Sequence, residues 1–175
     1  MIPRRLLSVD PAATSGWALW RNGVLSSWGS VVIAHPDDVP GRIVRRWWDS
    51  HPRMGGNAEV ERHNVLVVES HGARMRNAVT AERLIEHRRT WEVVAELAGW
   101  TVERVLVQTW QAAILGRGRA GAEKIIARQI AEREAARAGG FDDAVTISED
   151  AADAICVGKY WLMKKRLEAA GGPKR

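Results

Sequence analysis

The sequence predicts an α/β fold in which a mixed β-sheet is flanked by helices on both faces. Three closely spaced strand patterns open the chain, and Asn22-Gly23 is a two-residue hairpin signal between the second and the third. Two later apolar runs, one of them VLVVE at Val65–Glu69, alternate with helical patterns. Strands in direct succession pair as an antiparallel meander, whereas the later strands need helical crossovers, which make neighbouring strands parallel.

The first half of the chain supplies four of the five expected strands. Apolar runs and turn signals place strands at Arg4–Asp10, Gly16–Arg21, Val24–Ile33 and Val65–Glu69, with a turn at Pro11–Ser15. Val39, Ile43, Trp47 and Trp48 recur roughly at helical spacing, so a helix is expected within Pro36–Ser50, beginning near Asp37 to Gly41. Pro52–Asn64 is polar and is expected to be a loop.

The second half is mostly helical. Apolar positions predict a long helix over Asn77–Gly99, with Gly99 as its stop, and then a strand over Trp100–Val107. Further helices are expected at Thr109–Leu115, at Ala122–Ala138 and within Thr146–Arg166. Thr146 with Glu149 fits a capping box at the start of the last helix.

The length and composition indicate one domain without a membrane segment. A chain of 175 residues fits a single domain, expected over residues 1–168 and followed by a flexible tail at 169–175. No apolar run approaches the roughly 20 residues that cross a bilayer, and no signal-peptide pattern precedes Asp10. We therefore expect a soluble protein of the cytoplasm. The single cysteine, Cys156, excludes a disulfide framework and is expected in the core. The periodic segments place Trp17, Trp20, Trp28, Trp91 and Trp161 in the core or at an interface rather than as base-stacking platforms.

The charge balance favours a polyanionic partner. The chain carries 26 Lys+Arg against 21 Asp+Glu, which gives a net charge of +5 and a pI near 10.0. Arginine accounts for 21 of these 26 cations, and its guanidinium binds phosphate in a bidentate manner. High-GC coding or adaptation to heat enriches arginine equally well, so the charge alone leaves the partner open.

Four acidic residues form the candidate catalytic set. Asp10 and Glu69 each end a predicted central strand, and ligands of open α/β sheets collect at strand ends. Asp150 and Asp153 are three residues apart, about 60° around one helix face. Taken singly, the strand-end acids fit salt-bridged termini, and the helix acids fit the favourable dipole of a first turn.

Taken together, the four acids point to hard divalent cations. Carboxylate oxygens without clustered Cys or His suit Mg²⁺ or Mn²⁺ rather than zinc. In a basic protein the expected substrate is a phosphodiester, held by two metal ions about 4 Å apart. Asp10 is the expected bridge between the two ions, and their charge would offset the cost of burying this carboxylate at a strand end.

Three motifs, VDPAATSGWALW, VLVVES and EDAADAICVG, resemble in order and separation the RuvC family of Holliday junction resolvases, within the ribonuclease H-like superfamily. The likeness covers nearly the whole chain and implies a ribonuclease H-like mixed five-stranded sheet. It implies that Asp10, Glu69, Asp150 and Asp153 bind two Mg²⁺ ions, for which Mn²⁺ can substitute. It also implies a homodimer that makes paired nicks across a four-way DNA junction, with water as the nucleophile and with ends that can be ligated. Phage-type members are among the relatives that the motifs resemble.

The resemblance extends to residues expected to contact DNA. RuvC proteins have a glycine-containing loop followed by a lysine at the scissile region, and the segment GRGRAGAEK offers Arg117, Arg119 and Lys124. Lys124 is the best match, with the role of neutralising the phosphate during cleavage. A solvated loop is the alternative for this segment.

The sequence also departs from the family at two places. The segment QTWQAAILG has Gln108 and Gln111 where RuvC proteins have a basic residue, and no aromatic follows the Glu69 motif. In ESHGARMRNAV, Met75 is the candidate wedge at the junction centre. Arg74 and Arg76 are the candidate phosphate contacts beside it, and His71 lies near enough to Glu69 to be either a catalytic group or a hydrogen-bonding neighbour.

Three other functions are alternatives to junction resolution. A debranching nuclease that accepts flaps and Y-forks would use the same four acids. A non-catalytic DNA-binding relative would have lost one or more of them, and all four are present. An actin-like kinase or ATPase also begins with a strand, an aspartate and a Ser/Thr/Gly-rich turn, but needs a second nucleotide-binding half for which 175 residues leave no room. The expected setting is the cytoplasm of a bacterial or phage-infected cell.

Overall fold

The computed structural model describes residues 2–33, 40–50, 64–71, 78–116, 121–139 and 146–171, and in them five strands form one sheet in the order β3-β2-β1-β4-β5. β2 pairs antiparallel with both β1 and β3, whereas β4 runs parallel to both β1 and β5. The expected mixed sheet is therefore confirmed. The strands are β1 (Arg5–Asp10), β2 (Thr14–Arg21), β3 (Val24–Val32), β4 (Asn64–Ser70) and β5 (Thr101–Leu106).

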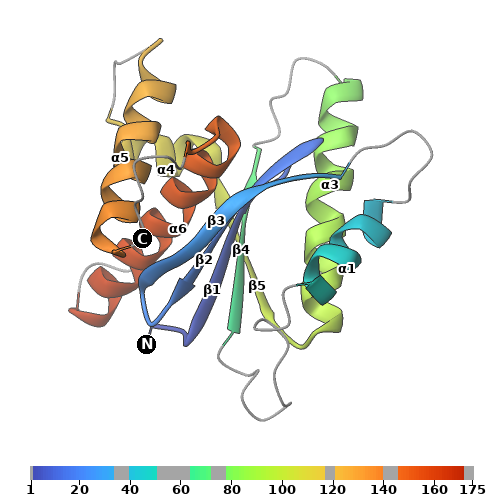
Figure 1. Cartoon of the computed structure of the whole chain (residues 1–175), viewed down its shortest axis with the longest axis horizontal. Helices are drawn as coiled ribbons and strands as arrows, with labels where there is room; N and C mark the ends of the chain where they lie inside the picture. The colour runs from blue at the N-terminus through green and yellow to red at the C-terminus, as the bar shows by residue number, and fades with distance from the viewer. Residues whose placement is uncertain are drawn as a thin grey trace.

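Helices cover both faces of the sheet (Figure 1). One face carries α1 (Pro40–Ser50) and α3 (Ala78–Leu97), and the other carries α4 (Val107–Ile114), α5 (Glu123–Arg137) and α6 (Glu149–Ala169). Among the residues described, no helix combines the length and the apolar character that crossing a bilayer requires.

The core beneath α6 depends on small residues that let the layers approach closely. Ala127, Ala131 and Ala135 recur every fourth residue along α5 and are buried against α6. In α6 itself Gly158 lies over the sheet, where a Cβ would stand 2.3 Å from Trp20 Nε1 and 2.5 Å from Ser8 Oγ. Because no larger side chain fits there, Gly158 lets α6 lie directly on β1 and β2.

Tryptophans fill the core on the opposite face. Trp47 of α1 packs edge to face against Trp17 of β2 and Trp91 of α3, with ring centroids 5.1 Å apart in both pairs. Trp48 makes a similar contact with Trp100 at 4.9 Å. The expected burial of Trp17, Trp20, Trp91, Trp161 and Cys156 is confirmed, and Trp28 is half-buried against the core under α6.

Several element boundaries differ from the sequence-based expectation. β2 begins at Thr14 rather than Gly16, because Ser15 Oγ accepts the N–H of Ala12 and donates to its carbonyl, which closes the turn early. Asn64, expected in a loop, opens β4. β5 stops one residue before Val107, which starts α4 with no intervening loop. The expected loop at 52–63 and the first part of the helix expected within 36–50 lie outside the described residues.

The predicted capping box of the last helix is wrong. α6 begins at Glu149, and its N-cap is Ser148, whose extended backbone lets Oγ accept the N–H of Ala151 at 3.2 Å. Thr146 lies two residues too early to reach the first turn. Glu149 does not reach back to the cap but pairs with Lys124 of α5.

Candidate metal centre

Asp10 and Glu69 lie side by side at the carboxyl-terminal ends of two neighbouring central strands. Their strands, β1 and β4, are parallel neighbours in which Val9 pairs with Val68, so the next residue of each strand is one of the two acids. Side chains alternate between the faces of a strand, and Val67 belongs to the core beneath α6. Glu69, two residues further on, therefore points to the α6 side, where it is almost completely buried.

The first turn of α6 brings the other two acids to the same place. Gly16 of β2 is the pairing partner of Asp10, and the main chain of Asp150 packs directly on this glycine. Asp153 lies one turn further along α6, on the side where its charge reaches Asp10 and Glu69. The structure thus gathers the four predicted acids from β1, β4 and α6.

Burial is the main cause of a raised pKa at all four carboxyl groups. Burial raises the pKa of Asp10 well above its usual value, and the charges of Glu69, Asp153 and Asp150 raise it further. Burial likewise raises the pKa of Glu69 to about 7 and that of Asp153 to about 6. Asp10 is the one acid whose pKa is shifted by all three others, which makes it the centre of the set.

A buried indole contacts this set. Trp110 of α4 donates its Nε1–H to Oε2 of Glu69 at 2.6 Å, and only 1% of its surface is exposed. Reasoning from the sequence missed this contact, which joins residues 41 positions apart. The available signal was general: a buried tryptophan usually finds an acceptor for its N–H.

Two of the secondary candidates are described, and both lie close to the acids. Lys124, in the first turn of α5, forms a solvent-exposed ion pair with Glu149, and its charge also reaches Asp150 and Asp153. His71 Nε2 stands 3.6 Å from Glu69 Oε1, beyond hydrogen-bonding distance. Burial and the charge of Arg88 lower the pKa of His71, so the imidazole is neutral at pH 7.

The remaining DNA-binding candidates cannot be placed. Arg74, Met75, Arg76, Arg117 and Arg119 lie outside the described residues, so their roles stay predictions. The described flanks of the second segment, Gly116 and Gly121, both have positive φ angles, of 84° and 86°. Such angles favour glycine over residues with a side chain.

The donor atoms fit a hard divalent cation. Burial and three neighbouring charges shift the pKa of Asp10. All of them raise it, and all three charges belong to the other candidate acids. A cation among these oxygens would offset that repulsion, and oxygen-only sets suit Mg²⁺ or Mn²⁺. As the side chains stand, no group of three or more His, Cys, Asp or Glu residues in the described ranges is arranged to hold a metal ion.

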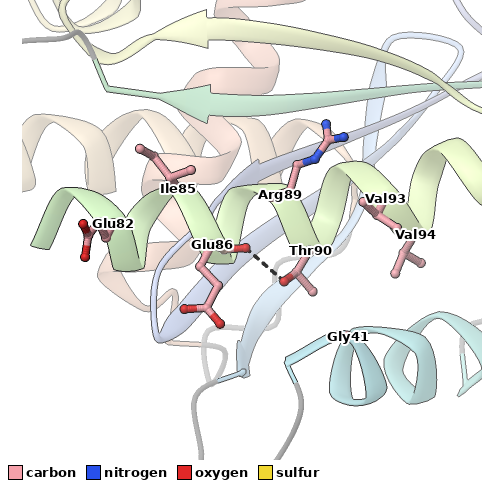
Figure 2. Close-up of a pocket in the computed structure, with 8 residues that line it drawn as sticks. All are labelled: Gly41, Glu82, Ile85, Glu86, Arg89, Thr90, Val93 and Val94. Atoms are coloured by element: carbon pink, nitrogen blue, oxygen red, sulfur yellow. Dashed lines mark hydrogen bonds between the residues drawn. The ribbon is translucent and has the colours of Figure 1, made fainter. Parts of the chain in front are cut away.

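A separate groove lies on the opposite side of the sheet, between α1 and α3 (Figure 2). Its walls are mainly apolar, and Thr90 and Glu86 are linked there by a hydrogen bond along α3 from Thr90 Oγ1 to the Glu86 carbonyl at 3.0 Å. None of the four acids lines it. The groove residues are Gly41, Glu82, Ile85, Glu86, Arg89, Thr90, Val93 and Val94.

Comparison with known proteins identifies the fold. No protein-family model and no curated protein matches the chain. Among solved structures, Thermus thermophilus RuvC in complex with a Holliday junction substrate is similar, with a TM-score of 0.62, 15% sequence identity, and coverage of 93% of this chain and 95% of RuvC. A second structure of T. thermophilus RuvC matches with a TM-score of 0.62, 17% identity, and coverage of 94% and 96%. The expected RuvC-type, ribonuclease H-like fold is confirmed.

Proposed function

We propose that the chain is a structure-selective endodeoxyribonuclease that resolves four-way DNA junctions with divalent metal ions. One observation carries the proposal: Asp10, Glu69, Asp150 and Asp153 converge from three elements at the carboxyl-terminal ends of two neighbouring central strands. They do so in a fold shared with RuvC, one of whose structures holds a Holliday junction. Residues 1–168 would act as one nuclease domain, in the cytoplasm of a bacterial or phage-infected cell.

The four acids would hold two Mg²⁺ ions, with Mn²⁺ as a substitute. Bound there, the ions would supply charge stabilisation for the attacking and leaving oxygens of phosphodiester hydrolysis. Asp10 is the natural shared ligand, since its carboxylate interacts with all three other acids. Glu69 and Asp153, both partly or fully buried, would present oxygens that are shielded from water.

Lys124 would neutralise the scissile phosphate. It lies at the start of α5 near Asp150 and Asp153, although its ammonium is paired with Glu149. Because both partners are exposed, that ion pair contributes little stability, and a phosphate can replace Glu149 at low free-energy cost. The pair therefore keeps Lys124 beside the acids without blocking its proposed role.

DNA would be held mainly through its backbone. The net charge of +5 supports phosphate contacts, and Arg74, Arg76, Arg117 and Arg119 are proposed to make them, with Met75 at the junction centre. Binding should then weaken steeply as salt rises. A junction affinity that does not change between 50 and 200 mM salt would count against phosphate recognition.

Two copies of the chain would make the paired nicks. The exposed face of α3 offers an apolar row of Ile85, Val93 and Leu97, in which Ile85 and Val93 line the groove and Leu97 is 75% exposed. A row of this kind is typical of a face that is covered in an assembly. We propose a homodimer through this face, and a mass of one chain in solution under cleavage conditions would contradict it.

The decisive experiment compares branched and unbranched substrates. Immobile and mobile four-way junctions, flaps, Y-forks and linear duplexes are incubated with the chain and Mg²⁺, and the nick positions are mapped. Symmetrical nicks confined to the junctions are the expected result. Equal cutting of flaps and Y-forks would replace the proposal with a debranching nuclease, and binding without any cutting would indicate a non-catalytic relative.

A further inference from the structure

The side chain of Glu69 is held by an unusual partner for a carboxylate at a candidate metal centre. Among the hydrogen bonds between described residues, Glu69 is the one of the four acids whose carboxylate accepts any, and its donor is the indole of Trp110 at 2.6 Å. Glu69 is 4% exposed and Trp110 1% exposed. The contact is therefore shielded from water, where a hydrogen bond to a charged acceptor is strong.

The backbone places this indole without a connecting loop. β5 ends at Leu106 and passes directly into α4 at Val107, and Leu106 pairs with Ser70, the residue after Glu69. Trp110 follows one helical turn later, over the end of β4. Its position is consequently tied to the same strand end that carries Glu69.

The chemistry of the indole makes it a fixed donor. An indole N–H donates one hydrogen bond, accepts none and keeps its proton at any pH the protein experiences. It engages Oε2 of Glu69, and among the described residues Oε1 accepts no hydrogen bond and lies 3.6 Å from His71 Nε2. A glutamate side chain has three rotatable bonds, and this contact holds its carboxylate in one orientation before any ligand arrives.

We infer that Trp110 is a positioning residue, which orients the Glu69 carboxylate to bind a divalent cation. The inference rests on the proposed metal-dependent nuclease function and adds to it a residue that contacts neither metal nor DNA. Donors of this kind behind a metal ligand typically contribute 10- to 100-fold to metal affinity or activity.

Trp110→Phe provides the test, because phenylalanine keeps one aromatic ring in the core and removes the N–H donor together with the second ring of the indole. The matched control is Trp161→Phe. Trp161 is 2% exposed and donates its Nε1–H to Glu103 Oε2 at 2.8 Å, a carboxylate outside the four acids. Both variants therefore lose one ring of a buried indole and one indole–carboxylate hydrogen bond, so the volume removed is the same in each.

The primary readout is the affinity of the full chain for Mn²⁺ in the absence of DNA. It is measured by calorimetry and by the electron paramagnetic resonance signal of free Mn²⁺. We expect Trp110→Phe to weaken Mn²⁺ binding about tenfold or more, and Trp161→Phe to change it less than about twofold. In junction cleavage, kcat should fall for Trp110→Phe while KM stays within about twofold. If Trp110 had only a structural role, both variants would have lower melting temperatures, and their affinities for Mn²⁺ would be the same.

A second pair of measurements keeps the test decisive. Trp110→Met fills the site with an adaptable apolar side chain and carries the test if the phenylalanine variant does not fold. In a Glu69→Gln background, Trp110→Phe should cause no further loss of Mn²⁺ affinity, because its effect passes through Glu69.

Two outcomes overturn the inference in distinguishable ways. If the unaltered chain binds Mn²⁺ and cuts junctions, and the folded Trp110 variants bind Mn²⁺ equally well, the positioning role is wrong and the nuclease function stands. If the unaltered chain neither binds Mn²⁺ nor cuts junctions, both proposals fail together.

Discussion

Gly16 lies so close to the main chain of Asp150 that no side chain fits between them. A Cβ built on Gly16 would stand 1.8 Å from the carbonyl oxygen of Asp150 and 2.1 Å from its carbonyl carbon. Because Gly16 is paired with Asp10 across the β1–β2 ladder, this contact sets the first turn of α6 over the end of β1. The spacing of the proposed metal ligands therefore depends on a residue without a side chain.

Gly16→Ala should displace the start of α6. The added methyl group clashes with backbone, which cannot rotate away, so we expect the free energy of unfolding to fall by about 2 kcal/mol or more. Junction cleavage should fall at least tenfold in protein that remains folded, because Asp150 and Asp153 move with the helix. Denaturant unfolding and a cleavage assay measure the two effects.

Gly41→Ala is the matched control for that substitution. Gly41 lies in α1, where a Cβ would meet nothing within 4 Å. Alanine favours helix over glycine, so unchanged or slightly higher stability is expected, by up to about 1 kcal/mol. Equal losses in the two variants would show that Gly16 has no special relation to α6.

Asp10→Asn should abolish cleavage and stabilise the metal-free protein. Asparagine keeps the shape of the side chain but removes one of four mutually repelling charges, so the melting temperature in EDTA should rise by a few degrees. Junction binding should change less than about threefold, because the basic surface is intact. Asp153→Asn is expected to behave in the same way, and near-normal cleavage by either variant in Mg²⁺ would refute the four-acid site.

The stability of the metal-free protein should fall as pH rises from about 4.5 to 7. Folding raises the pKa of Glu69 from its usual 4.5 to about 7 and that of Asp153 from 3.8 to about 6. The folded state therefore binds more protons than the unfolded state in this window, and deprotonation opposes folding by roughly 2 kcal/mol for each of the two groups.

Urea unfolding in EDTA at a series of pH values checks this dependence. Saturating Mg²⁺ should flatten the curve, since a bound cation favours the charged carboxylates. Glu69→Gln should reduce the slope between pH 5 and 7. A free energy of unfolding that rises through this range in EDTA would contradict the raised pKa values.

Lys124→Ala should slow cleavage more than it weakens binding. If the ammonium neutralises the phosphate during the chemical step, kcat should fall by about 100-fold, while junction affinity falls by less than about fivefold. Arg128→Ala is the control, because Arg128 lies one turn along α5 in an exposed pair with Glu132. Equal losses of rate and affinity for Lys124→Ala would mean that the lysine only binds the DNA phosphate backbone and has no part in the chemical step.

A buried carboxylate on the other face of the sheet should matter for stability alone. Glu92 of α3 is fully buried and accepts hydrogen bonds from Arg104 of β5 at 2.7 and 2.8 Å, with Arg88 and Arg89 also within 3.4 Å. Burial would raise the pKa of Glu92, but the hydrogen bonds and charges of these arginines lower it overall. Arg88 in turn donates to Ser70 Oγ at 2.9 Å, which joins the network to the strand end beside Glu69.

Glu92→Gln should destabilise the fold by about 3 to 5 kcal/mol, because it leaves the arginines around the site without their shared anion. The control is Arg45→Gln, which breaks an exposed pair with Asp49 in α1 and should cost less than about 1 kcal/mol. Thermal and urea unfolding of both variants decide between these outcomes. A loss as small for Glu92→Gln as for Arg45→Gln would mean that the network contributes nothing.

Much of the fold was predictable because it is encoded by neighbouring residues. The hairpin at Asn22-Gly23 follows from two residues with positive φ angles of 51° and 78°, which asparagine and glycine tolerate. The errors fell at boundaries that depend on contacts. Thr146 looked like an N-cap in sequence, but the helix start is set by Ser148 and by the packing of Asp150 on Gly16.

The candidate site likewise has features that the sequence predicts and contacts that only the fold reveals. Asp10, Glu69, Asp150 and Asp153 could be singled out as candidates, because acids at strand ends and in one helical turn are visible as patterns. Neither the hydrogen bond from Trp110 to Glu69 nor the ion pair between Lys124 and Glu149 has such a pattern. Both contacts join residues far apart in the chain, by 41 positions for Trp110 and Glu69 and by 25 for Lys124 and Glu149.

The sequence by itself determined the succession of strands and helices along the chain and singled out the four candidate acids, since periodicity and turn chemistry act over a few residues. The tertiary structure decided how those residues meet. It set α6 against Gly16, brought Trp110 to Glu69 and surrounded Asp10 with like charges. The reason is physical: these contacts depend on how closely whole layers can pack, which is determined by side-chain volumes on several elements at once.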